Sequence, residues 1–156
     1  MFDIKEKTMT PTENLKRLGL TLPNLSPPAG SYVHATRSGN LLFLAGKGAG
    51  KYTGKVGKNV SLEQAREYAC STTLMLLAAI QNEIGTIDKV KQFLKISGFI
   101  NSAPDFSDHP KVMDACSNLL KEIFGERGVH ARTSIGVAAT PSQIPVEIEA
   151  IIEIKE

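Results

Sequence analysis

The residues best suited to chemistry lie in the closing segment, from His130 to Ala150. Arg132 stands at the head of a short β-like run, and a guanidinium at a strand end offers paired N–H donors to a planar carboxylate. Glu147 follows a proline-bounded loop, on a strand-like run whose acids share one face. A carboxylate in that place can act as a general base or hold a water molecule. These two residues are therefore the main candidates for a functional site.

Both candidates also have an ordinary structural interpretation. Most surface arginines only form an ion pair with a nearby acid, and alternating acids on a strand usually make a solvated face. If residues 140–145 form a plain hairpin loop, Arg132 lies opposite Glu153. At about 3.3 Å per residue, Arg132 and Glu147 are then roughly 20 Å apart along the strands. We therefore expect either a bulged register or an acid near Arg132 that comes from another chain.

Three more polar side chains accompany this pair. Tyr32 falls in a strand-like run, where it either fills a sheet edge or contributes to a cleft. Ser134 carries a hydroxyl, but no residue is placed by the sequence as the base that a nucleophilic serine needs. His130 abuts Arg132 and either lines the same cleft or caps the strand. No metal site is expected, because metal-ligand spacing is absent among His34, His109, His130, Cys70 and Cys116.

A glycine- and lysine-rich run from Gly46 to Tyr52 has some likeness to a phosphate-binding loop. Its spacing is wrong, Tyr52 stands where Ser or Thr would hold magnesium, and no helix starts directly after it. We predict a solvated loop instead, or a rim whose lysines draw anions toward Arg132.

The elements that position these residues follow from hydrophobic periodicity and turn signals. Ser61 and Gln64 form a capping box at the start of the strongest helix, and Gly85 closes it. The predicted elements are a short helix over 10–18, a connector over 21–30, strands Tyr32–Thr36 and Leu41–Ala45, a loop Gly46–Gly57, a helix Ser61–Gly85, a strand Val90–Asn101, a helix Pro110–Phe124, and strands Thr133–Ala139 and Val146–Ile154.

After the leading helix, the order ββαβαββ predicts an α+β fold. Both main helices are amphipathic, so the simplest packing is one mixed β-sheet with the two main helices packed on one face. The other sheet face stays bare and carries Glu147, Glu149, Ile151 and Glu153 of the last strand. Such a face is either exposed to solvent or buried in a subunit interface.

Length and composition narrow the class of protein. The 156 residues fit a single domain over 1–156. A formal net charge of +2 and 6% aromatic residues argue against a nucleic-acid surface. No apolar stretch approaches the roughly 18 residues of a membrane span, and the N-terminus has no secretory signal pattern. The two distant cysteines are expected to be free thiols. We therefore expect a soluble cytoplasmic protein without membrane contact.

Taken together, these segments resemble the RidA family, also called YjgF or, in older naming, endoribonuclease L-PSP. The resemblance covers nearly the whole chain and is closest to a longer, less characterised subgroup. It is carried by Ala131–Ser134, Val146–Ala150, Gly30–Val33, Gly39–Gly46 and Ser97–Phe106. It implies a chorismate-mutase-like α+β fold and a homotrimer whose sheets form a central barrel, with sites in the clefts between subunits.

The resemblance also implies chemistry and residue roles. Members with known chemistry hydrolyse reactive enamines and imines, such as 2-aminoacrylate, to a keto acid and ammonia, without a metal or organic cofactor. Arg132 matches the arginine that binds the substrate carboxylate, and Tyr32 matches a tyrosine of the cleft. Glu147 matches the acid that positions the hydrolytic water, and Gly46 matches a glycine whose backbone faces the ligand.

Three positions depart from the well-studied members. Ala45 replaces a serine, Ser134 replaces a cysteine, and Lys47 stands where a polar amide is usual. The carboxylate clamp carries over, and the departures fall on the placement of substrate nitrogen and water. We expect enamine or imine deamination. The alternatives are a non-catalytic trimer that binds small carboxylates or a partner protein and, disfavoured by charge and composition, an endoribonuclease.

Overall fold

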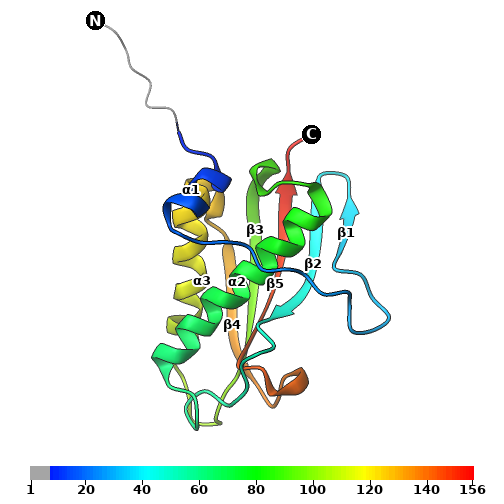
Figure 1. Cartoon of the computed structure of the whole chain (residues 1–156). Coiled ribbons are helices and arrows are strands. Elements are labelled where there is room, and N and C mark those ends of the chain that lie inside the picture. The colour runs from blue at the N-terminus through cyan, green and yellow to red at the C-terminus, as the bar shows by residue number, and fades with distance from the viewer. Residues whose placement is uncertain (1–7) are drawn as a thin grey trace, which may run out of the picture.

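The backbone forms one five-stranded sheet with the strand order β1-β2-β5-β3-β4. A computed structural model describes residues 8–156 (Figure 1). Strands β3 and β4 are parallel, and the other neighbouring pairs are antiparallel. The elements are α1 (Pro11–Arg17), β1 (Ala35–Ser38), β2 (Leu41–Gly48), α2 (Leu62–Ile84), η1 (Ile87–Lys89), β3 (Val90–Asn101), α3 (His109–Phe124), η2 (Gly125–Gly128), β4 (Ala131–Val137), η3 (Pro141–Gln143) and β5 (Val146–Ile154).

The helix ends follow from local sequence. In α2, the Gln64 N–H donates to Ser61 Oγ at 3.1 Å, and the Ser61 N–H donates to Gln64 Oε1 at 2.9 Å. Thr10 and Glu13 make the same reciprocal pair at α1. Each such cap contributes about 1 kcal/mol. Gly85 ends α2 with φ 84°, a conformation that costs glycine little. These signals are short-range, which is why the sequence predicts both helices.

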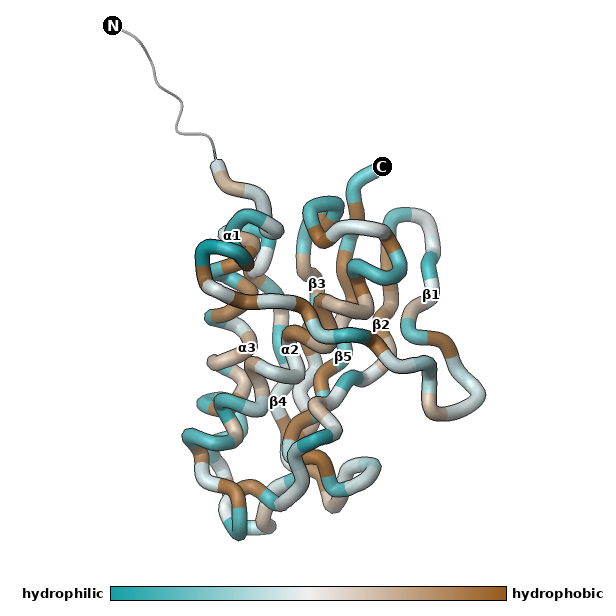
Figure 2. Tube along the Cα trace, in the orientation of Figure 1, coloured by the Kyte–Doolittle hydropathy of each residue, from teal (hydrophilic) through white to brown (hydrophobic). Residues whose placement is uncertain are grey.

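The core lies between the sheet and the two long helices. Figure 1 shows α2 and α3 on the same face of the sheet, and Figure 2 shows hydrophobic residues recurring along β2, β3 and β5. Fully buried side chains come from both layers and include Leu76, Leu77, Ile80, Val112, Leu120, Ile96, Ile148 and Ile152. The predicted mixed α+β sheet with its two main helices on one face is confirmed. The predicted single domain includes residues 1–7, which lie outside the described part, and stays a prediction.

The first two strands differ from their predicted bounds. β1 begins at Ala35, so Tyr32 precedes the strand, and β2 continues to Gly48 through the predicted loop. A register shift between Leu44 and Lys47 explains both differences. The bulge ends the regular β1–β2 ladder, after which only a bond from Ala45 N to the carbonyl oxygen of His34 remains. The hydrophobic alternation of β2 is broken there, and the sequence therefore predicts a loop.

The hairpin considered from the sequence for the last two strands does not form. β5 lies between β2 and β3, whereas β4 pairs in parallel with the outer side of β3. A parallel pair needs a crossover, and α3 supplies it between β3 and β4. Arg132 consequently pairs with Ile96 on β3 and has no register with Glu153. The separation of Arg132 and Glu147 that was calculated for a hairpin therefore does not apply.

The sheet face away from the helices stays uncovered in one chain. Phe43 lies opposite Ile151, and Phe99 lies opposite Ile135. Phe43 is 40% exposed and Ile135 is 45% exposed. Apolar pairs thus interrupt the acids of β5, so this face has the mixed composition of a subunit interface.

No helix of the described residues combines the length and apolar character that crossing a membrane requires.

Candidate functional site

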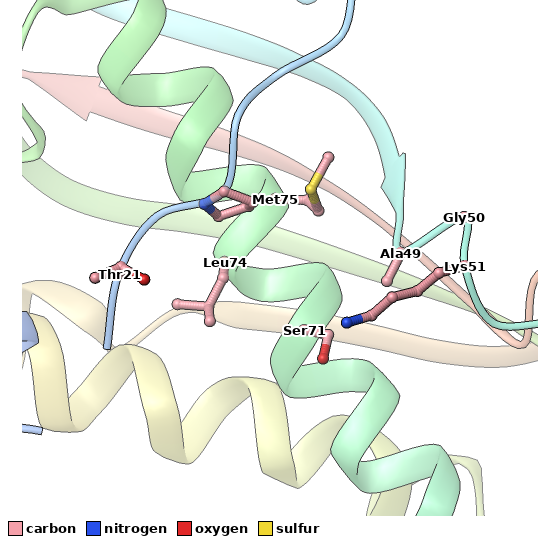
Figure 3. A pocket seen from close by; sticks show the side chains of 8 residues that line it. Thr21, Ala49, Gly50, Lys51, Ser71, Leu74 and Met75 are labelled. Carbon is pink, nitrogen blue, oxygen red and sulfur yellow. The ribbon is translucent and has the colours of Figure 1, made fainter. Parts of the chain in front are cut away.

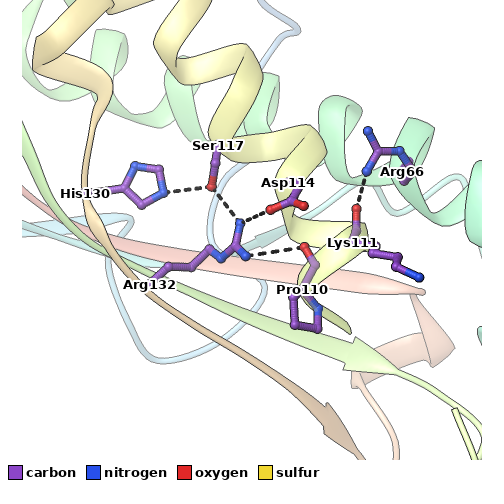
Figure 4. Close-up of polar contacts among 7 residues, drawn as sticks. All are labelled: Arg66, Pro110, Lys111, Asp114, Ser117, His130 and Arg132. Carbon is purple, nitrogen blue, oxygen red and sulfur yellow. Dashed lines mark hydrogen bonds and ion pairs between the residues drawn. The ribbon is translucent and has the colours of Figure 1, made fainter. Parts of the chain in front are cut away.

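Arg132 is held against α3 by hydrogen bonds at its head group (Figure 4). Its Nη1 donates to Asp114 Oδ1 at 2.9 Å and to Ser117 Oγ at 3.0 Å. Its Nη2 makes a longer bond of 3.4 Å to the Pro110 carbonyl oxygen. The side chain of Arg132 is 21% exposed and that of Asp114 is 50% exposed. An ion pair this exposed contributes at most about 1 kcal/mol, so its main effect is to orient the guanidinium. The sequence led us to expect either a bulged register or an acid from another chain beside Arg132; the acid found there is Asp114 of the same chain.

These bonds leave part of the guanidinium open. Nη1 uses both of its protons, and Nε makes no hydrogen bond within residues 8–156. Nε and Nη2 share one edge of the planar group, and two parallel N–H donors on an edge match a carboxylate. Arg132 is thus fixed on one side and able to bind an anion on the other.

His130 supports this arrangement through Ser117. The Gly128 carbonyl oxygen lies 2.7 Å from His130 Nδ1 and can only accept, so Nδ1 carries a proton. Nε2 then accepts from the Ser117 hydroxyl at 3.0 Å, and Ser117 accepts from Arg132. Burial lowers the pKa of His130; its bond to Gly128 opposes this, and the Arg132 charge adds to it. A neutral imidazole therefore positions Ser117 and, through it, Arg132.

A cavity of about 470 Å³ opens beside this network. Ser134 lies two residues beyond Arg132 and pairs with Gly98 of β3. Its Oγ is buried and has no hydrogen-bond partner among the described residues. The cavity itself is lined by Ser117, Asn118, Lys121, Gly128, Val129, His130 and Arg132.

A second group of predicted residues gathers around Glu147. Gly46 packs directly under it, because a Cβ on residue 46 would overlap the Glu147 carboxylate. Burial raises the pKa of Glu147 above its ordinary value; Glu149 adds to this, and Lys47 opposes it. A carboxylate whose pKa is raised is a stronger proton acceptor than an ordinary one, which suits it to act as a base.

Lys47 is almost fully buried, at 5% exposed. Its Nζ donates to the carbonyl oxygens of Ala45 at 3.2 Å and Gly46 at 3.3 Å. Burial lowers its pKa, and Glu147 opposes that shift. The lysine therefore fastens the bulge that carries Ala45 and Gly46, rather than lying on a solvated loop as predicted.

Tyr32 lies ahead of β1, outside the sheet, and is 48% exposed. Its hydroxyl accepts a long hydrogen bond of 3.4 Å from the Ala29 N–H. Because β1 and β4 are the two edges of the sheet, Tyr32 and Arg132 are separated by the sheet's full width, about 19 Å at about 4.8 Å per strand. A single chain does not bring them together.

The structure thus divides the predicted site into two half-sites. The Arg132 half-site contains Arg132, His130 and Ser134 on β4 and the turn before it. The Glu147 half-site contains Glu147, Gly46 and Ala45 on β5 and β2, and Tyr32, which precedes the edge strand β1, is assigned to neither half-site. Within residues 8–156, no cluster of three or more His, Cys, Asp or Glu side chains could hold a metal ion.

Asp114 and Ser117 are the functional candidates that sequence reasoning missed. They are three residues apart and therefore share one side of α3, beside the apolar stripe. This spacing was a usable signal, but it does not indicate which strand the side faces. That depends on the parallel pairing of β4, which the sequence pattern did not predict.

One mixed sheet with both helices on one face, and a clamped arginine on its edge strand, define a small α+β protein of chorismate-mutase-like fold. The chain belongs to the family described as "YjgF/chorismate mutase-like, putative endoribonuclease", whose model matches residues 12–147. The resemblance to the RidA/YjgF family is therefore confirmed.

Two relatives and one solved structure extend this finding. Protein TCP17 of Trypanosoma cruzi is 34% identical over 147 residues, covering 90% of this chain and 92% of that protein. The 2-iminobutanoate/2-iminopropanoate deaminase of Dermatophagoides farinae is 27% identical over 141 residues, covering 87% and 95%. The crystal structure of Atu1372, a protein of unknown function from Agrobacterium tumefaciens, is 37% identical with a TM-score of 0.84, covering 93% of this chain and 92% of that one.

Proposed function

We propose that the protein hydrolyses small reactive enamines or imines that bear a carboxylate, releasing a keto acid and ammonia. The observation that carries this proposal is the orientation of Arg132. Its Nη1 is tied to Asp114 and Ser117, and its Nε and Nη2 edge remains able to bind an anion. The deaminase name of the Dermatophagoides farinae relative supports the reaction class.

In the proposed reaction, Arg132 binds the substrate carboxylate and fixes the position of the imine carbon. Glu147 accepts a proton from a water molecule as that water adds to the carbon. Glu147 returns that proton to the nitrogen, which gives a neutral carbinolamine. The carbinolamine hydroxyl then loses its proton to the nitrogen as the C–N bond breaks, so that ammonia leaves and the carbonyl of the keto acid forms. Such substrates already hydrolyse in water, so orientation and a placed water account for the acceleration.

The proposed catalyst is a homotrimer, because the two half-sites do not meet in one chain. The mixed bare face around Phe43, Ile151, Phe99 and Ile135 offers the surface for assembly. Packing of this face would set the β4 edge of one subunit near the β2–β5 region of the next. The cleft between subunits would then hold Arg132 from one chain and Glu147 from another.

The test is imine turnover by the Arg132→Ala variant. 2-Aminoacrylate is generated in solution by a β-eliminating enzyme, and pyruvate release is followed with and without the protein. Loss of a charge-assisted contact to the substrate predicts a fall in kcat/KM on the order of 100-fold. Arg37→Ala is the matched control, because Arg37 lies on the opposite edge strand and its side chain, among described residues, donates only to the Gly39 carbonyl oxygen. Full activity of Arg132→Ala would rule out the proposal.

A second candidate is a trimer that binds small carboxylates without turning them over. Two features favour it. Ala45 and Ser134 replace a serine and a cysteine of the well-studied members, and the ion pair with Asp114 offsets part of the charge of Arg132. Saturable binding of pyruvate without acceleration of 2-aminoacrylate hydrolysis would decide for this function.

A further inference from the structure

A second cavity, of about 350 Å³, is lined in part by α2 and by no residue of either half-site. Three of its walls come from distant parts of the sequence: the connector before β1, the loop after β2 and one stripe of α2 (Figure 3). Ser71, Leu74 and Met75 form the stripe, since residues three and four apart share a helix face. The full lining is Thr21, Pro23, Ala49, Gly50, Lys51, Ser71, Leu74 and Met75.

One end of this cavity is polar and cationic. Figure 3 shows the Lys51 side chain extending from the turn after β2 toward Ser71 on α2. The Lys51 ammonium lies 5.0 Å from the centre of the Tyr52 ring, which in turn stacks on Tyr68 at 4.0 Å. Hydrogen bonds from Lys51, and then from Ser71, lower the pKa of Tyr52. One full positive charge and hydroxyl groups therefore meet at a single place.

The rest of the cavity is apolar. Pro23, Leu74 and Met75 are partly buried, and Ala49 is 9% exposed. Among the described residues that line the cavity, none is acidic and Lys51 is the single charged one. An apolar wall with one cation at its end matches a molecule that has a hydrocarbon tail and one negative charge. A phosphate monoester carries up to two negative charges, so a single lysine matches it less well than it matches a carboxylate.

We infer that this cavity binds an amphipathic monocarboxylate, with the carboxylate at Lys51 and Ser71 and a short hydrocarbon tail along Leu74 and Met75. The volume lies at the small end of ligand sites, about 300–1,000 Å³, so the tail is short. The inference does not depend on the proposed imine chemistry, because none of these residues belongs to either half-site.

Hexanoate is the probe, titrated into the full chain labelled at its methionine methyl groups. The Met75 methyl resonance is expected to shift saturably, while that of Met113, which is fully buried in the core, stays in place. Acetate, which has no tail, and hexylamine, which has the wrong charge, are expected to produce no saturable shift of Met75.

Two variants locate the binding. Lys51→Gln is expected to weaken hexanoate about tenfold or more, since a bond to a charged group is lost. Lys58→Gln is the control, because Lys58 is an exposed lysine further along the same connection between β2 and α2 and does not line the cavity. Lys51 is itself exposed, so its replacement leaves the fold intact.

Arg132→Ala separates this cavity from the proposed imine site. The Met75 shift is expected to persist in that variant whether or not imine turnover is lost. A Met75 shift that disappears in Arg132→Ala, or that Lys51→Gln leaves unchanged, would overturn the inference, as would the absence of any saturable shift.

Discussion

Arg132 and Glu147 face opposite sides of the same sheet. Arg132 pairs with Ile96, whose side chain is buried under the helices, whereas Glu147 alternates with the buried Val146 and Ile148. They are also about 10 Å apart along the strands, with two strand spacings of about 4.8 Å between them. The two principal candidates therefore need a second chain to form one site.

Subunit complementation tests that requirement. Arg132→Ala and Glu147→Gln chains are each expected to be inactive alone. In trimers co-expressed at equal amounts, a cleft that takes Arg132 from one chain and Glu147 from its neighbour is intact in about a quarter of cases, by random assembly around a closed ring. Pyruvate release should recover to about that fraction of wild type. No recovery would show that each chain supplies both residues to its own site.

Removal of the acid beside Arg132 is expected to strengthen carboxylate binding. Asp114 shares Nη1 with Ser117 and offsets part of the positive charge. Asp114→Asn keeps an oxygen acceptor and removes the competing charge, which corresponds to about 1 kcal/mol, or roughly fivefold, in the Kd for pyruvate. Isothermal titration calorimetry measures this change. The opposite result, much weaker binding, would mean that the charge of Asp114 is needed to orient the guanidinium.

Gly46 is expected to be indispensable for activity because of Glu147. A methyl group at residue 46 must displace the Glu147 carboxylate, whereas a Cβ at Gly50 meets nothing within 4 Å. Gly46→Ala should therefore lower kcat/KM by about tenfold or more, as expected for a misplaced base, and Gly50→Ala should leave it unchanged. Circular dichroism and thermal melting check that both variants fold. Equal activity in the two variants would argue against a catalytic Glu147.

The raised pKa of Glu147 has a consequence for activity. If its carboxylate activates water, kcat/KM should fall as pH decreases through a value above the ordinary 4.5. Glu147→Gln should abolish this acid limb along with most of the activity. A rate profile in which the limb persists in Glu147→Gln would assign it to another group.

The titration of Glu147 should also affect stability, but in the opposite direction: activity rises with pH, whereas stability falls. A pKa raised on folding means that the native state binds more protons than the unfolded state, so stability decreases as pH rises. The decrease spans the window from the ordinary pKa of 4.5, taken for the unfolded chain, up to the raised folded pKa, and is complete above it. Urea denaturation across this window should show a smaller decrease for Glu147→Gln than for wild type.

The sequence by itself determined the helices, the fold class and the candidate residues. The capping box at Ser61, helical spacing of apolar residues and alternation in Val146–Ile154 are patterns over a few neighbouring positions. The motifs around Arg132 and Glu147 are similarly short. Such local preferences survive in the folded protein because they agree with its packing. The role of Arg132 in binding a substrate stays a prediction.

The tertiary structure decided which of these residues meet. β4 pairs with β3 because α3 provides a crossover, and this pairing brings Arg132 to Asp114 and Ser117 and separates it from Glu147. The bulge after Leu44 decides that Lys47 is buried beside Glu147. Strand order and bulges depend on contacts between residues far apart in the chain, which no local pattern encodes. The sequence therefore indicated the candidate residues, and the fold places Arg132 and Glu147 on opposite faces of one sheet.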